Sequence, residues 1–146
     1  MSNALIVHGG APTAVINASL YGIVEEAKKY SQIEKVYAAL GGSSGVLHRR
    51  FLDMKTVPQS KLDLLPFTPA SAIGTSRDHL RPEDYLSMAQ VIKEQNIRYI
   101  FFNGGNGSMD TCGKVYQACQ AIQADVQVVG VPKTIDNDIA VTDHAP

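Results

Sequence analysis

Residues 132–138 (PKTIDND) combine the side chains best suited to catalysis. Asp136 and Asp138 place two carboxylates two residues apart, close to Lys133. One acid could take a proton from an attacking hydroxyl and the other could hold Mg²⁺, while the lysine neutralises phosphate charge. A solvated loop of Asx turns is the structural alternative. Alone, the segment predicts phosphate chemistry without excluding a plain loop.

Two glycine-rich turns strengthen the prediction of a phosphate site. Gly9 and Gly10 end an apolar run, and residues 104–108 (GGNGS) end another, each before a helical pattern. Such a turn presents backbone N–H groups at the positive end of a helix dipole, where phosphate binds well. The first turn lacks the dinucleotide-binding spacing and the Walker lysine, so by itself it is equally a tight turn. Two such turns on one edge of a sheet favour a polyphosphate.

Residues 74–77 (GTSR) add a cation after a third turn of small residues. Most arginines serve only to solvate the surface. Here the guanidinium of Arg77 would match the charge that spreads over a transferring phosphoryl group.

The elements that must position these residues follow from hydrophobic periodicity and turn signals. The Val-rich run of the last strand is typical of a parallel strand covered on both faces. The three glycines of residues 41–45 indicate an irregular loop. Strands are predicted at residues 4–8, 35–40, 98–102 and 126–131, and helices at residues 12–30, 82–96 and 109–121.

Strands that alternate with helices predict an α/β fold, a three-layer Rossmann-like domain with a mainly parallel sheet. Residues 1–146 contain no linker or repeat, so we expect one domain. Ligands of such sheets bind beyond the carboxyl ends of the strands. The glycine turns and residues 132–138 should therefore meet at one edge.

Composition excludes several classes of partner. The 146 residues are 45% hydrophobic and 18% charged, with a net charge of -1 and no basic cluster, so neither nucleic acid nor a membrane surface is expected. There is no apolar run long enough to span a bilayer and no signal peptide pattern. Cys112 and Cys119 lie about two turns apart on one predicted helix, too far for a disulfide. We expect a cytoplasmic protein whose partners are small molecules and other subunits.

Taken in order, these motifs resemble the phosphofructokinase family. The resemblance rests on Gly9 and Gly10 with Pro12 and Asn17, and on residues 74–77, 104–108 and 132–138, and it spans the whole chain. It implies Mg²⁺-dependent transfer of a phosphoryl group from ATP or pyrophosphate to fructose 6-phosphate, giving fructose 1,6-bisphosphate in glycolysis. It also implies a dimer or tetramer of the full-length enzyme.

The resemblance also implies a role for each matching residue. Asp136 would be the general base for the sugar hydroxyl, and Thr134 would contact the sugar phosphate. Arg77 would stabilise the transferring phosphoryl group, and Lys133 would bind phosphate. The donor phosphates would lie against Gly10, Gly105, Asn106, Gly107 and Ser108, and the metal near Asn106 and Asp138.

Departures from the family pattern leave the donor open. Asn106 stands where the family usually has an aspartate near Mg²⁺, and its carbonyl oxygen is a weaker, neutral ligand. Gly107 favours ATP, because pyrophosphate users often carry an aspartate there. Lys133 favours pyrophosphate, as do Ser43 and Ser44, where bacterial ATP users often place an aromatic residue.

Length is a further departure, and it defines the main alternative. Family members are more than twice as long as 146 residues, so the chain resembles their N-terminal, donor-binding part. A catalytically silent phosphate-binding or regulatory module is the alternative. A dinucleotide-dependent oxidoreductase is less favoured, since the fingerprint is missing and no acid ends the second strand. The histidines show no metal-ligand spacing, which favours structural or solvated roles for His8, His48, His79 and His144.

Overall fold

The computed structural model describes residues 1–133 and 140–141. In them, five strands form one sheet in the order β3-β2-β1-β4-β5. The strands are β1 (Ser2–His8), β2 (Ile33–Ala39), β3 (Phe51–Asp53), β4 (Ile97–Gly104) and β5 (Gln127–Pro132). All neighbouring pairs are parallel except β2 with β3, which is antiparallel. The predicted α/β three-layer fold is confirmed.

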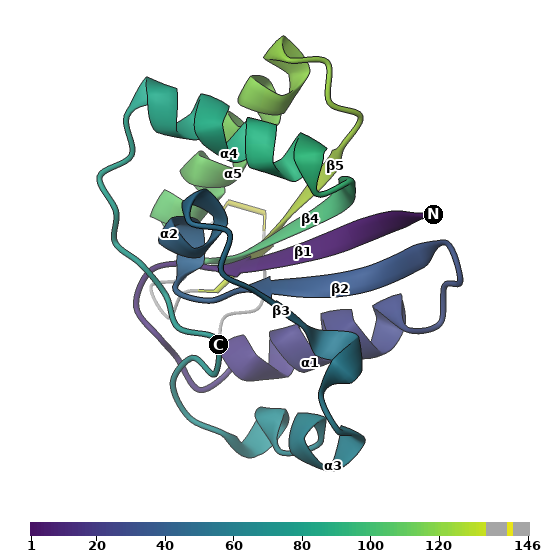
Figure 1. Ribbon diagram of the computed structural model, residues 1–146. Helices are drawn as coiled ribbons and strands as arrows, with labels where there is room; N and C mark the ends of the chain where they lie inside the picture. The colour runs from purple at the N-terminus through teal and green to yellow at the C-terminus, as the bar shows by residue number, and fades with distance from the viewer. Residues whose placement is uncertain (134–139, 142–146) are drawn as a thin grey trace.

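Helices cover both faces of the sheet, as Figure 1 shows. One face carries α1 (Ile16–Ala27), and the other carries α4 (Pro82–Glu94) and α5 (Asn106–Ala121). Short helices occupy the segments between them: α2 (Gly42–Leu47), η1 (Met54–Thr56), α3 (Gln59–Leu62) and η2 (Leu65–Phe67). None of the helices in residues 1–133 and 140–141 has the length and apolar character needed to cross a membrane.

Alternation along β1 explains the two cores. Ala4 and Ile6 face α1, whereas Leu5 and Val7 face α4 and α5, and all four are buried. Side chains of a strand alternate between faces, so a strand covered on both sides is apolar throughout. Because β1 lies between β2 and β4, its carboxyl end lies in the middle of the edge formed by the carboxyl ends of the parallel strands.

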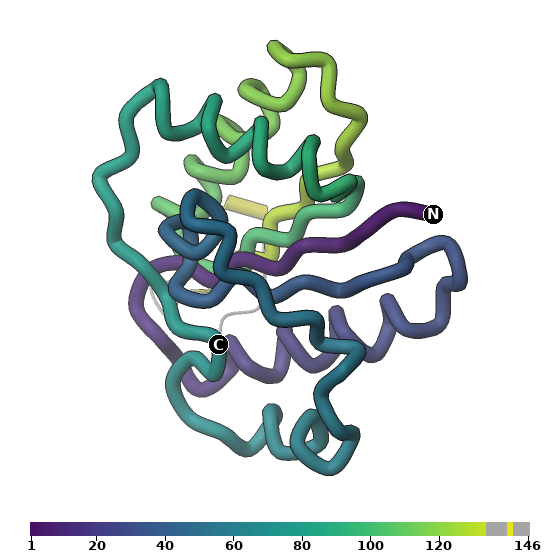
Figure 2. Tube along the Cα trace, in the orientation of Figure 1, coloured from purple at the N-terminus to yellow at the C-terminus, as the bar shows by residue number. Residues whose placement is uncertain are grey.

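A long connection, residues 68–81, passes the carboxyl ends of the strands on its way from the α1 side of the sheet to α4 (Figure 2). It contains no helix or strand. At its end Pro82 opens α4, and the Asp84 carboxylate accepts a hydrogen bond from the Arg81 N–H at 2.8 Å. Proline at the first helical position and an acid in the first turn are typical helix starts.

Two expectations from sequence were wrong. Residues 41–45 are not a loop throughout, because a six-residue helix, α2, begins at Gly42. Gly41 reaches the required left-handed conformation at φ 85°. Among the described residues, the last strand is not covered on both faces: β5 ends the sheet order, and Val129 is 47% exposed. Apart from its pairing with β4, the main packing of β5 within the described residues is on α5.

Candidate functional site

The first glycine turn continues directly from β1. His8 is the last residue of the strand, and the Gly9 N–H donates to the Asn103 carbonyl of β4 at 3.0 Å. Gly10 has a φ of 72°, in the left-handed region that favours glycine. Helix α1 begins only at Ile16, so this turn does not itself cap a helix, contrary to the sequence prediction.

The second turn caps α5. Strand β4 ends at Gly104, and Gly105, which has no side chain to form a capping hydrogen bond, is the N-cap. The first N–H groups of a helix lack intrahelical partners and carry partial positive charge, so they suit an anion. The helix begins at Asn106, three residues before the predicted start, and includes Gly107 and Ser108.

The two turns touch through Ser108. A Cβ atom added to Gly9 would lie 2.2 Å from the Ser108 Oγ, and one added to Gly104 would lie equally close. A Cβ added to Gly10 would lie 3.9 Å from the Gly105 nitrogen. A side chain at Gly9 or Gly104 would therefore collide with Ser108, whereas Gly10 is favoured by its positive φ.

The third turn joins the site through α2. The Gly41 N–H donates to the Ile73 carbonyl at 2.8 Å, and the Ser43 N–H donates to the Ser76 Oγ at 3.1 Å. A Cβ on Gly42 would lie 2.6 Å from the Ser76 Oγ and 2.8 Å from the His8 carbonyl oxygen. Residues 74–77 thus lie against the end of β1.

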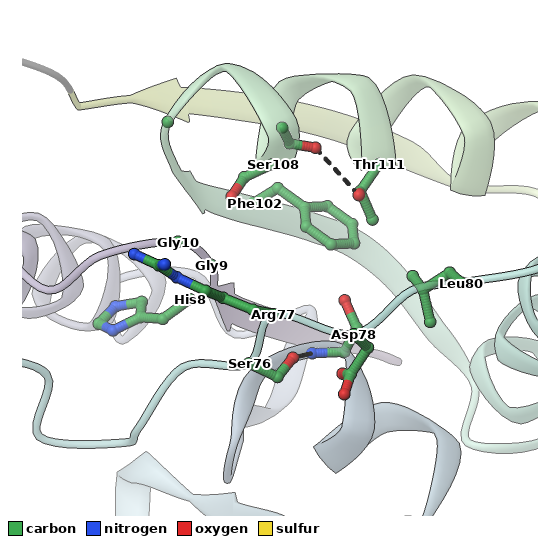
Figure 3. A pocket seen from close by; sticks show the side chains of 13 residues that line it. His8, Gly9, Gly10, Ser76, Arg77, Asp78, Leu80, Phe102, Ser108 and Thr111 are labelled. Carbon is green, nitrogen blue, oxygen red and sulfur yellow. Dashed lines mark hydrogen bonds between the residues drawn. The ribbon is translucent and has the colours of Figure 1, made fainter.

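The three turns enclose a cavity of about 220 Å³. In Figure 3 the exposed Arg77 side chain extends across it toward Gly9 and Gly10. No carboxylate of the described residues forms an ion pair with Arg77. The cavity is lined by His8, Gly9, Gly10, Ser43, Ser76, Arg77, Asp78, Leu80, Phe102, Gly105, Gly107, Ser108 and Thr111.

Lys133 adds a second cation beside the first turn. Its backbone N–H donates to the Gly104 carbonyl at 2.9 Å, and its Nζ donates to the Ala11 carbonyl. A Cβ on Gly10 would lie 3.8 Å from this Nζ. Because the side chain is only 6% exposed, its charge acts where water screens it little.

His8 is a buried neutral group at the base of the cavity. Burial, and secondarily the charge of Lys133, lower the pKa of His8 from 6.5 to about 4. Desolvation disfavours the charged imidazolium, and a nearby cation disfavours it further. The imidazole is therefore neutral at physiological pH.

Five predicted site residues line the cavity together: Gly10, Arg77, Gly105, Gly107 and Ser108. Asn106 is exposed at the start of α5, and Lys133 lies beside Gly10. Thr134, Asp136 and Asp138 lie outside the described residues. Sequence reasoning missed several lining residues, namely Asp78, Leu80, Phe102, Thr111 and His8. The signal for His8 was its position at the carboxyl end of a strand.

Comparison with known proteins assigns the family. The Phosphofructokinase family matches residues 3–146. The chain belongs to this family. Pyrophosphate–fructose 6-phosphate 1-phosphotransferases of Rhodospirillum rubrum and Halomonas elongata are both 37% identical to it, over 97% and 99% of the chain. An ATP-dependent 6-phosphofructokinase of Entamoeba histolytica is 27% identical over 96% of the chain.

A solved phosphofructokinase shares the architecture closely. The pyrophosphate-dependent phosphofructokinase of Nitrosospira multiformis has a TM-score of 0.91 and 38% identity over 97% of this chain. The chain covers only 36% of that structure, and 35% and 36% of the two phosphotransferases. It thus spans about a third of the length of these phosphofructokinase relatives.

The low pKa of His8 predicts how the stability of this phosphofructokinase chain depends on pH. Between pH 6.5 and about 4 the unfolded chain binds more protons at His8 than the folded chain. Stability from this group is complete above pH 6.5 and falls as the pH drops toward 4, by about 2–3 kcal/mol at pH 4.5. Urea unfolding at pH 7.5 and 4.5 measures the loss, which His8→Asn should reduce. If the His8→Asn variant lost as much stability between pH 7.5 and 4.5 as the parent, the pH dependence would not come from His8. His48→Asn, at an exposed histidine, is the matched control.

Proposed function

We propose that the chain is the donor-binding domain of a phosphotransferase that transfers a phosphoryl group to fructose 6-phosphate. The cavity at the carboxyl ends of β1 and β4 carries the proposal. Two glycine turns, the start of α5 and Arg77 converge there. Together they supply N–H donors, dipole charge and a guanidinium, which suit a polyphosphate.

Pyrophosphate is the donor that we propose first. Relatives 37% identical to the chain are named for pyrophosphate, and Lys133 places a cation beside Gly10. Gly107 supports ATP as the second donor, because a Cβ added there would meet no atom of the described residues within 4 Å outside its own stretch of helix. That space leaves room for the part of a nucleotide beyond its phosphates.

Acceptor chemistry is proposed from residues 134–138 by family resemblance. Asp136 would take the proton of the sugar 1-hydroxyl as it attacks the donor, and Thr134 would contact the sugar phosphate. Arg77 and Lys133 would neutralise the charge of the transferring phosphoryl group. A sulfofructose kinase of Alkalicoccus urumqiensis is 30% identical to the chain, so a related sugar acceptor belongs in any substrate screen.

Mg²⁺ is the cofactor that we propose. The exposed Asn106 stands at the start of α5 beside the cavity, where its carbonyl oxygen suits this ion. No group of three His, Cys, Asp or Glu side chains within residues 1–133 and 140–141 forms a protein cage for a metal. This fits Mg²⁺, which usually takes one or two protein oxygens and completes its shell with phosphate and water. Asn106 and Asp138 would hold it and supply charge stabilisation to the donor phosphates.

The proposal extends to the whole enzyme. The longer protein would be a homo-oligomer, and the acceptor contacts not found here would come from the part that its relatives have in addition. Both cysteines are free thiols, which supports a reducing, cytoplasmic compartment. A silent phosphate-binding module is the second candidate, favoured by Asn106, which is a weaker, neutral ligand for Mg²⁺ than a carboxylate.

Calorimetric titration with magnesium pyrophosphate, and separately with magnesium ATP, tests the donor site. We expect tighter binding of pyrophosphate and at least a tenfold weaker affinity in Arg77→Ala, because a charged hydrogen bond contributes about 1.5–3 kcal/mol. Arg98→Ala is the matched control, since Arg98 pairs with Asp125 at the opposite end of β4. Equal losses in both variants would argue against the proposed site.

Turnover of the full-length enzyme tests the role of Asp136. Asp136→Asn keeps the shape of the side chain and removes the base, so kcat should fall by about 10²–10⁴-fold with donor affinity unchanged. Turnover within a few fold of the parent would rule out this role. A full-length parent that binds donor without turning over fructose 6-phosphate or a related sugar would instead support the silent module.

A further inference from the structure

A buried hydrogen-bond chain links the end of β1 to the connection that carries Arg77. His8 is 0% exposed, and its Nδ1 lies 2.7 Å from the Ser71 Oγ. The Ser71 hydroxyl in turn donates to the Gly74 carbonyl at 3.0 Å. A hydroxyl has one proton to donate, so Ser71 must accept from His8. The His8 Nδ1 therefore carries a proton.

The opposite nitrogen of the ring is held from β4. Asn103, also 0% exposed, donates from Nδ2 to the Ile16 carbonyl at 3.0 Å, which fixes the orientation of its amide. The same Nδ2 lies 3.3 Å from the His8 Nε2, which must then be the acceptor. Both neighbours thus select one neutral tautomer, with its proton pointing toward the connection.

Other contacts of the described residues also hold the connection in place. The Ala72 N–H donates to the Asn17 Oδ1 at 2.8 Å. The Ile73 carbonyl and the Ser76 Oγ accept from the N–H groups of Gly41 and Ser43. Residues 71–77 contain no helix or strand, so their position depends on these individual bonds and on Ile73, which is buried in the core on the α1 side of the sheet. Arg77 lies at the cavity end of this segment.

We propose that His8 is a positioning residue. Through Ser71 it holds residues 71–77 so that the Arg77 guanidinium lies at hydrogen-bond distance from the donor phosphates. This inference rests on the proposed polyphosphate site. An imidazole spans the gap between Asn103 and Ser71, accepting on one side and donating on the other. Misplacing a guanidinium by a fraction of an ångström weakens a charged hydrogen bond and the geometry of transfer. The role is indirect, and His8 itself needs no contact with substrate.

Affinity for magnesium pyrophosphate in a mutant cycle tests this role. We expect His8→Leu and Ser71→Ala each to weaken binding about tenfold, since each frees the connection from β1. In an Arg77→Ala background the same changes should have an effect of less than twofold, because Arg77 no longer makes the contact that they disturb. Asparagine places an amide nitrogen near the position of Nδ1, so His8→Asn should restore part of the affinity. The exposed His48→Asn should bind as the parent does.

Amide hydrogen exchange provides the second measurement and covers the case in which His8→Leu fails to fold. In Ser71→Ala the amides of Gly41 and Ser43, which bond to the connection, should exchange at least tenfold faster, whereas that of Ile100 in the core should not change.

Undiminished affinity in Ser71→Ala, or equal losses with and without Arg77, would overturn the positioning role while leaving the proposed function intact. A parent chain that binds neither pyrophosphate nor ATP would overturn the proposed function, and this inference with it.

Discussion

The site depends on how closely the ends of β1 and β4 approach the start of α5. Gly9 and Gly104 both lie against Ser108, where a single added Cβ would collide at 2.2 Å. Parallel pairing of β1 with β4 brings the two strand ends to the same level, His8 opposite Asn103. Only with no side chains between them can both turns direct backbone N–H groups at one ligand. The position of the cavity is therefore a consequence of backbone packing.

Charge around the cavity is consistent with an anionic ligand. Arg77 and Lys133 approach it from different segments, and the N-terminus of α5 adds dipole charge, against one lining carboxylate, that of Asp78. His8 contributes no charge, because burial and Lys133 keep it neutral. A neutral histidine accepts one hydrogen bond and donates another, whereas the charged form would lose its acceptor. The low pKa and the hydrogen-bond chain through Ser71 thus have a common origin in the packing of β1.

Much of the fold could be predicted from local patterns, and the exceptions share a cause. The central strands and α4 follow from periodicity and the Pro82 start, and the two glycine turns predicted five of the thirteen residues that line the cavity. Helix α2 could not be predicted, because its composition is that of a loop and its first turn is held by Ser76, which lies 33 residues from its partner Ser43. The exposure of Val129 depends on which elements cover β5, and the part played by His8 depends on Ser71, 63 residues away. Contacts of long sequence separation decided each case.

Chemical-shift mapping of the amide resonances during titration with magnesium pyrophosphate tests the central claim most directly. If the turns form one polyphosphate site, the largest changes should fall on Gly9, Gly10, Arg77 and the first turn of α5. Amides near Lys93 and Arg98, which line a separate cavity at the other end of the sheet, should not change. Saturable shifts confined to that other end, or none at the glycine turns, would contradict the account.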